Sequence, residues 1–152
     1  MSDLTFALLD ETGLSILRSW YSDPELQRRL EYPTQTWFDY VSGEPNVHAW
    51  MIQEDDLSVG HLQLDVGADQ TGYIGFCVKP ELRNQGYGKR ILRAFLARSE
   101  VRTLNRIVAE AEVDNSASHS CLKAAGFAQE GNGPDEYGFL RFIYTTANTA
   151  GR

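Results

Sequence analysis

Apolar residues follow two different spacings along the chain. In the first 40 residues they recur every three or four positions, as at Leu14, Leu17 and Tyr21, which is the spacing of an amphipathic helix. From residue 47 onward, short apolar runs separated by turn residues are typical of strands. The pattern predicts three short helices, starting near residues 10, 24 and 34, ahead of a region rich in strands.

The later part of the chain alternates strands with helices. Strands are predicted at residues 47–53, 58–66, 73–79, 106–113, 127–131 and 137–145, and helices at 86–98 and 117–125. The 86–98 helix has the strongest signal, because Ile91, Leu92, Phe95 and Leu96 form one apolar stripe. This order predicts an α/β domain with a mixed sheet over residues 1–145, followed by a polar, frayed tail at 146–152.

The charges are distributed unevenly. Residues 1–80 hold 13 acidic and 4 basic residues, a net charge of −9, whereas residues 81–152 hold 8 acidic and 10 basic residues, a net charge of +2. A strongly acidic first half disfavours nucleic acid as a partner. Seven basic residues between positions 83 and 106 fit either a solvated helix face or a local anion site, and composition alone leaves both open.

Several other classes of protein are disfavoured by simple counts. The chain of 152 residues is about the length of one domain and has no run of 18 apolar residues, so no membrane span or membrane partner is expected. The first residues show no secretory pattern, and Cys77 and Cys121 are too few for a disulfide framework or a zinc site. We therefore expect a cytoplasmic protein without a metal.

A glycine-containing segment joins the predicted strand at 73–79 to the strongest helix. Gly86 and Gly88 allow a ligand to approach the backbone closely, and the first turn of a helix offers unpaired N–H groups and a partial positive charge. Arg83, Lys89 and Arg90 add formal charge, so the segment suits an anion. It matches neither the Walker nucleotide loop nor the dinucleotide fingerprint, and a plain helix start remains an alternative.

Two motifs resemble the signatures of the GNAT N-acetyltransferase superfamily. Residues 83–88 read RNQGYG, which is similar to the family's [RQ]-x-x-G-x-[GA] pyrophosphate loop, and residues 115–118 read NSAS, similar to its second signature. A helix that ends in Gly126 and Phe127 follows the second signature, as in the family. The resemblance covers residues 3–145 and looks closest to the branch that acetylates ribosomal-protein N-termini and aminoglycosides.

The resemblance implies a fold and a co-substrate. The fold would be a single GNAT-like domain with a mixed, mostly antiparallel sheet, splayed between residues 73–79 and 106–113 and flanked by helices on both faces. Acetyl-CoA would bind in the splay without a metal, and the N–H of Val78 would hold the developing oxyanion. The implied cofactor contacts are Phe76, Cys77, Val78, Arg83, Gln85, Gly86, Tyr87, Gly88, Lys89, Asn115 and Ser118.

The chain departs from the family at both familiar catalytic side chains. Tyr73 stands where many members carry a glutamate base, and Leu122 where many carry a tyrosine acid. Tyrosine, with an ordinary pKa of about 10, is a poor base at neutral pH. The candidates for catalysis are Glu31, Tyr73 and Ser118. Asp65, Glu112, His48 and His61 remain alternatives, and His119 is expected to be exposed.

The predicted function follows from this resemblance and from the charge. We expect an N-acetyltransferase that moves an acetyl group from acetyl-CoA to a primary amine, on a small cationic molecule or a protein N-terminus, by direct attack in a ternary complex. The acidic first half favours a cationic acceptor. The alternative is a catalytically weak acyl-CoA-binding regulatory module, and the oligomeric state, including a homodimer, is left open.

Overall fold

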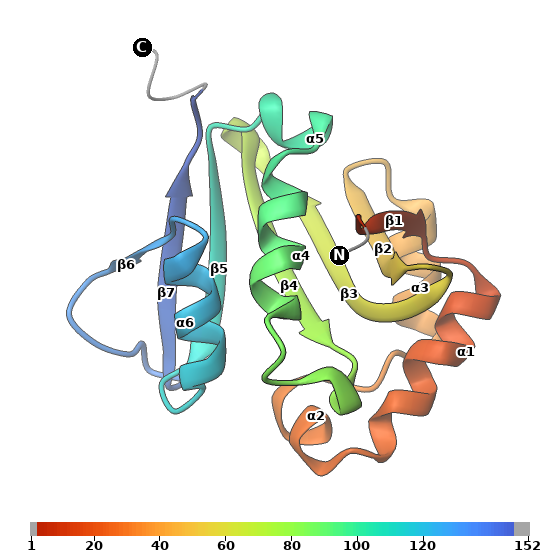
Figure 1. Cartoon of the computed structure of the whole chain (residues 1–152). Helices are drawn as coiled ribbons and strands as arrows, with labels where there is room; N and C mark the ends of the chain where they lie inside the picture. Colours follow the sequence, from red (N-terminus) through yellow and green to blue (C-terminus); the bar gives the residue numbers. More distant parts are fainter. Residues whose placement is uncertain (1–2, 148–152) are drawn as a thin grey trace. The chain divides into compact units, whose positions relative to one another are not determined.

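The seven strands of residues 3–147, the part of the chain that the computed structural model describes, pair in the order β1-β2-β3-β4-β5-β7-β6 (Figure 1). Their bounds are β1 Thr5–Leu8, β2 Val47–Glu54, β3 Leu57–Val66, β4 Thr71–Val78, β5 Arg106–Glu112, β6 Ala128–Glu130 and β7 Phe139–Thr145. The α/β class and the mixed sheet predicted from the sequence are confirmed. The chain divides into two compact units, Met1–Gln63 with Phe76–Tyr87, and Leu64–Gly75 with Gly88–Arg152.

The first unit contains the three helices expected at the start of the chain. They are α1 (Glu11–Ser19), α2 (Pro24–Arg29) and α3 (Gln35–Gly43). Each begins after a residue whose side chain accepts a hydrogen bond from a backbone N–H three positions later: Asp10 at 2.7 Å, Asp23 at 2.9 Å and Thr34 at 3.2 Å. Local capping chemistry therefore fixes all three helix starts.

Strand β1 was missed by the sequence reasoning, which expected helices first. It pairs antiparallel with β2, from Thr5 opposite Gln53 to Leu8 opposite Trp50. The strand is only four residues long, and its end residues Thr5 and Leu8 are exposed, so it carries almost no alternation of apolar and polar residues. Its pairing partner, more than 40 residues away, makes it a strand.

A buried cluster in the first unit holds the helices on the strands. Its members are Leu17, Trp20, Tyr21, Leu26, Met51 and Cys77, with Leu9, Leu30 and Trp37 packed against them. Cys77 packs among these larger side chains as a small apolar residue. The cluster joins α1, α2 and β2 to the end of β4, where the candidate cofactor loop begins.

The second unit contains the C-terminal strands and the remaining helices, α5 (Ser99–Arg102), α6 (Ser116–Ala124) and most of α4 (Tyr87–Leu96). Strand β5 pairs parallel with β4 over Thr71–Ile74 and antiparallel with β7 along its whole length. The last pair between β4 and β5 is Ile74 with Ala109. The hairpin of β6 and β7 is also confirmed.

Several predicted boundaries need correction. The strongest helix ends at Leu96 instead of residue 98, and the separate turn of α5 follows it. Thr146, expected to start a frayed tail, is buried, and its hydroxyl donates to the Leu104 and Asn105 carbonyls at 2.6 and 3.1 Å. The rest of the predicted tail, residues 148–152, lies outside the described residues.

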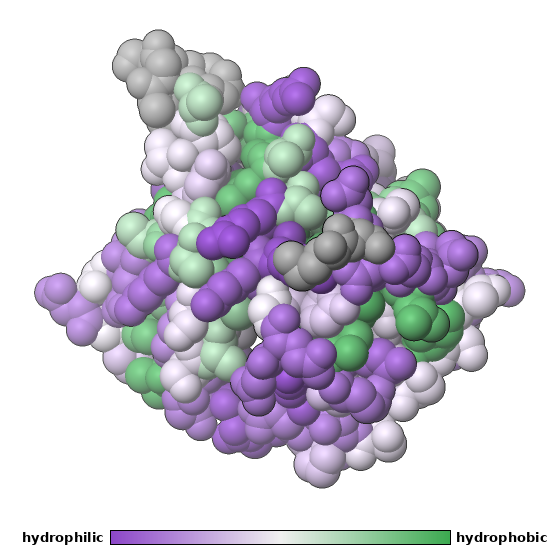
Figure 2. Space-filling model, in the orientation of Figure 1, coloured by the Kyte–Doolittle hydropathy of each residue, from purple (hydrophilic) through white to green (hydrophobic). Residues whose placement is uncertain are grey.

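One face of the molecule shows no large hydrophobic patch (Figure 2). The face drawn in Figure 2 is mostly hydrophilic, with hydrophobic residues in small separate groups. Within residues 3–147, no helix has both the length and the apolar character that crossing a membrane requires. The same residues contain no group of three or more histidines, cysteines or carboxylates placed to hold a metal ion.

Candidate active site

The predicted pyrophosphate loop has an unusual backbone. Asn84 and Gly86 both lie in the left-handed region, with φ of 63° and 84°. Such residues turn successive N–H groups toward one side, which makes a concave site for an anion. A Cβ placed on Gly86 would have no atom within 4 Å, so the space in front of the loop is open. The loop therefore fits the phosphate group that the family resemblance implies.

Three side chains of this loop make hydrogen bonds within the first unit. A terminal nitrogen of Arg83 donates to Asp23 Oδ2 at 2.7 Å, and the hydroxyl of Tyr87 donates to Glu54 Oε1 at 2.5 Å. The amide of Gln85 donates to the Glu81 carbonyl at 3.3 Å. These hydrogen bonds hold the loop, and the cofactor contacts of Arg83, Gln85 and Tyr87 stay predictions.

Asp23 serves two structural purposes at once. Its carboxylate caps α2 through the Leu26 N–H and pairs with Arg83, 60 residues later in the chain. The Arg83 hydrogen bond, with the Leu26 N–H as a smaller cause, lowers the pKa of Asp23. Sequence reasoning missed Asp23 and Glu54 as supports of the loop, because nothing near either residue in the sequence indicates a partner so far along the chain.

We expect Asp23→Asn to lower the free energy of unfolding at pH 7 by up to about 1 kcal/mol, since asparagine keeps the cap and loses the ion pair. The folded-state pKa is lowered, so the ion pair contributes above the unfolded pKa of about 3.9 and is lost as pH falls through the folded pKa. Urea unfolding at pH 7 and at lower pH checks this. Asp10→Asn is the matched control, because Asp10 caps α1 without an arginine partner; equal losses in both variants would contradict the prediction.

The end of β4 carries the residues predicted to line the pantetheine. Cys77 is buried, and this burial raises the pKa of its thiol to about 12, so the thiol stays neutral and part of the core. Phe76 and Val78 are half-buried, and the N–H of the next residue, Lys79, donates to the Val59 carbonyl at 2.8 Å. The cofactor contacts of these residues remain predictions.

The second unit holds the other predicted signature. Asn115 caps α6, its side-chain oxygen accepting from the Ser118 N–H at 3.3 Å, so these two candidate residues lie together. Gly88 is buried and Lys89 exposed in the first turn of α4. Leu122, at the family's tyrosine position, is 1% exposed and belongs to the core. The cofactor contacts predicted in this unit stay predictions: Gly88, Lys89, Asn115 and Ser118.

His61 is a poor candidate for a base, and the other two histidines pack against aromatic rings. His61 is buried, and its Nδ1 donates to the Trp50 carbonyl at 2.9 Å. Burial lowers the pKa of His61 to about 4, so it is neutral at pH 7 and enclosed. His48 stacks on the Trp50 ring. His119, expected to be exposed, is half-buried against Phe142 and bonds the Glu112 carbonyl through Nε2 at 2.9 Å.

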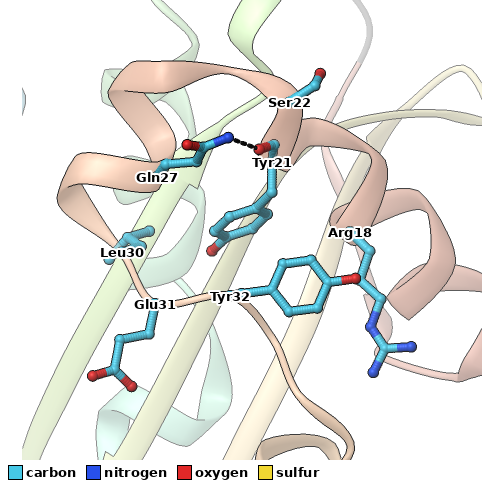
Figure 3. Close-up of a pocket in the computed structure, with 7 residues that line it drawn as sticks. All are labelled: Arg18, Tyr21, Ser22, Gln27, Leu30, Glu31 and Tyr32. Carbon is cyan, nitrogen blue, oxygen red and sulfur yellow. Dashed lines mark hydrogen bonds between the residues drawn. The ribbon is translucent and has the colours of Figure 1, made fainter.

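Tyr73 and Glu31 differ in their surroundings. Tyr73 is 42% exposed on β4, where it lies opposite Val108 of β5. Glu31 is exposed in the segment after α2 and lines a cavity of about 510 Å³ that lies wholly in the first unit (Figure 3). The cavity is lined by Arg18, Tyr21, Ser22, Gln27, Leu30, Glu31 and Tyr32. Its volume is in the range of small-molecule sites.

Comparisons with known proteins agree with this geometry. The model of the acetyltransferase (GNAT) family matches residues 14–127. The uncharacterized N-acetyltransferase YfmK of Bacillus subtilis (strain 168) is 33% identical over 140 residues, which cover 91% of this chain and 94% of YfmK.

Solved structures share the fold at low sequence identity. The aminoglycoside acetyltransferase AAC(6')-Ib, in complex with paromomycin and acetyl-CoA, superposes with a TM-score of 0.81 at 17% identity, covering 99% of this chain and 97% of that one. Spermidine N-acetyltransferase from Vibrio cholerae, in complex with CoA and spermine, gives 0.82 at 13% identity, covering 97% and 98%. Since the family model spans most of the sequence and YfmK matches nearly end to end, the chain belongs to the acetyltransferase (GNAT) family.

Proposed function

We propose that this protein transfers the acetyl group of acetyl-CoA to a primary amine, on a small cationic molecule or a protein N-terminus, by direct attack in a ternary complex. The observation that carries the proposal is the open, left-handed backbone at Asn84 and Gly86, at the start of α4, in a chain of the GNAT family. A family enzyme needs a place for the pyrophosphate, and this loop has the N–H groups and the open space for one.

The acetyl-CoA would be held chiefly by backbone groups. N–H groups of residues 85–89 would bind the pyrophosphate, with the exposed Lys89 adding charge. Phe76, Cys77 and Val78 would pair with the pantetheine as an added strand. Asn115 would bond a pantetheine amide, because its side chain can both donate and accept. The role of each residue is carried over from the family motif.

The acceptor would bind in the cavity of the first unit. This cavity contains Glu31, and residues 1–80 carry a net charge of −9, which raises the local concentration of cationic amines. Aminoglycosides and spermine occur in the complexes of the structural relatives, and all are amines. A cationic amine is therefore the acceptor class that the charge supports.

In the proposed step the amine nitrogen attacks the thioester carbonyl carbon, forming the C–N bond as the C–S bond breaks. The amine must be neutral to attack, so one proton passes, directly or through water, to a base such as Glu31. The N–H of Val78 would stabilise the developing oxyanion. The adduct nitrogen then gives up its second proton as the amide forms, and the departing thiolate takes up one proton, with Ser118 or Tyr73 as the candidate relay between the two, so that the products are the amide and the free CoA thiol.

Release of free CoA thiol across an amine panel tests the proposal. The panel would contain a polyamine, an aminoglycoside, amino acids and a peptide with a free N-terminus. We expect acetyl-CoA-dependent thiol release that requires the amine, with the acetylated product confirmed by mass spectrometry. CoA binding without turnover on any amine would instead favour the acyl-CoA-binding module.

A further inference from the structure

The cavity of the first unit contains a cationic side chain as well as Glu31. Arg18, in the last turn of α1, lines the same cavity, and Figure 3 shows its guanidinium and the Glu31 carboxylate on opposite sides of Tyr32. A site built only for a polycation would gain nothing from a guanidinium there, because like charges repel. The net acidic charge of residues 1–80 therefore does not explain why Arg18 lines this cavity.

Arg18 is fixed in place while most of its donors remain unused. Its Nε donates to the Pro33 carbonyl at 2.9 Å, and its guanidinium lies 5.7 Å from the centre of the Tyr32 ring. The two terminal nitrogens have no hydrogen-bond or carboxylate partner among residues 3–147. Two terminal nitrogens side by side match the two oxygens of a carboxylate.

Two aromatic side chains, Tyr21 and Tyr32, line the same cavity. The Tyr21 and Tyr32 rings meet edge to face, with their centres 5.5 Å apart. Tyr21 is 9% exposed, and its burial raises the pKa of its hydroxyl well above the ordinary value, so the group stays neutral. In Figure 3 this hydroxyl points toward the segment of Leu30 and Glu31. The two rings offer an apolar wall for the side chain of an acceptor that also carries an ammonium and a carboxylate.

We propose that the acceptor is a small amino acid-like molecule, whose carboxylate is bound by Arg18 and whose amine lies toward Glu31. This inference rests on the proposed function and specifies its acceptor as a primary amine that also carries a carboxylate. Arg18 is then a specificity-determining residue that contacts the acceptor, and the aromatic wall of Tyr21 and Tyr32 holds the side chain of the acceptor. A polyamine or an aminoglycoside would lack the group that Arg18 selects.

Two matched acceptors measure how much the carboxylate contributes to recognition by the enzyme. L-phenylalanine and L-phenylalaninamide share the amine and the ring, and only the first carries a carboxylate. We expect the wild-type enzyme to prefer L-phenylalanine at least tenfold in kcat/KM, measured by thiol release. Arg18→Gln should reduce this preference to less than threefold by lowering the value for L-phenylalanine alone, and Arg18→Lys should retain part of it.

Arg28→Gln is the matched control, because Arg28 is exposed on α2, pairs with Glu25 and does not line the cavity. It should keep the wild-type preference. No preference in the wild type, or an equal fall for both probes in Arg18→Gln with an unchanged melting temperature, would overturn the inference. The second result would mean that Arg18 only holds the Pro33 segment in place.

A binding measurement separates this inference from the proposed function. If neither probe is acetylated, acetyl transfer to these acceptors fails, and calorimetry with L-phenylalanine in the presence of CoA still tests Arg18. The carboxylate site is supported if L-phenylalanine binds to the wild type and to Arg28→Gln with similar affinity, and to Arg18→Gln with an affinity at least tenfold lower. No binding to the wild type, or equal binding to all three proteins, overturns it.

Discussion

Replacing Gly86 with valine is expected to weaken the binding of coenzyme A at least tenfold, which corresponds to about 1.4 kcal/mol. Gly86 has φ of 84°, a conformation that a β-branched residue adopts only with strain. Its missing side chain faces open space, where no atom lies within 4 Å. A valine there would stand where the pyrophosphate is expected, so both the shape of the loop and the access to it would change.

Titration calorimetry with coenzyme A measures the effect, and circular dichroism confirms that the fold is kept. Gly133→Val is the matched control. A Cβ on Gly133 would also meet no atom within 4 Å, but Gly133 has an ordinary φ and lies in the loop between β6 and β7. The control should bind coenzyme A as the wild type does. Unchanged affinity in a folded Gly86→Val variant would remove this loop from the cofactor site.

Features that depend on near neighbours in sequence could be predicted. The starts of α1, α2 and α3 are set by Asp10, Asp23 and Thr34, each of which acts on an N–H three positions away. The glycine loop could also be predicted, because the left-handed backbone that favours glycine at position 86 lies within the loop itself. These signals are short-range, so a single sequence contains them completely.

The supports of the same loop could not be predicted. The Arg83–Asp23 pair and the Tyr87–Glu54 hydrogen bond join residues that are 60 and 33 positions apart. Strand β1 likewise depends on β2 and has no pattern of its own. The partnership of Arg18 with the Pro33 carbonyl and the Tyr32 ring follows only from the way the chain turns after α2. Each of these features exists only once the tertiary fold brings its partners together.

Glu31→Gln is expected to lower turnover by about 10²- to 10⁴-fold, once an amine substrate is in hand, if Glu31 accepts the proton of the attacking amine. Glutamine has nearly the same shape and keeps a hydrogen-bonding group in the cavity, but it cannot take up a proton. Raising the pH supplies more of the amine in its neutral form, so part of the lost turnover should return. Steady-state kinetics across pH, with both constants determined, gives the measurement.

The two kinetic constants distinguish a base from a recognition residue. A carboxylate that only attracts a cationic amine would raise KM and leave kcat unchanged. Glu44→Gln is the control, because Glu44 is exposed beyond the end of α3 and does not line the cavity. If neither constant changes in Glu31→Gln, Glu31 is a surface residue. The search for the base then returns to Asp65, Glu112 and His48, since burial and a pKa of about 4 argue against His61.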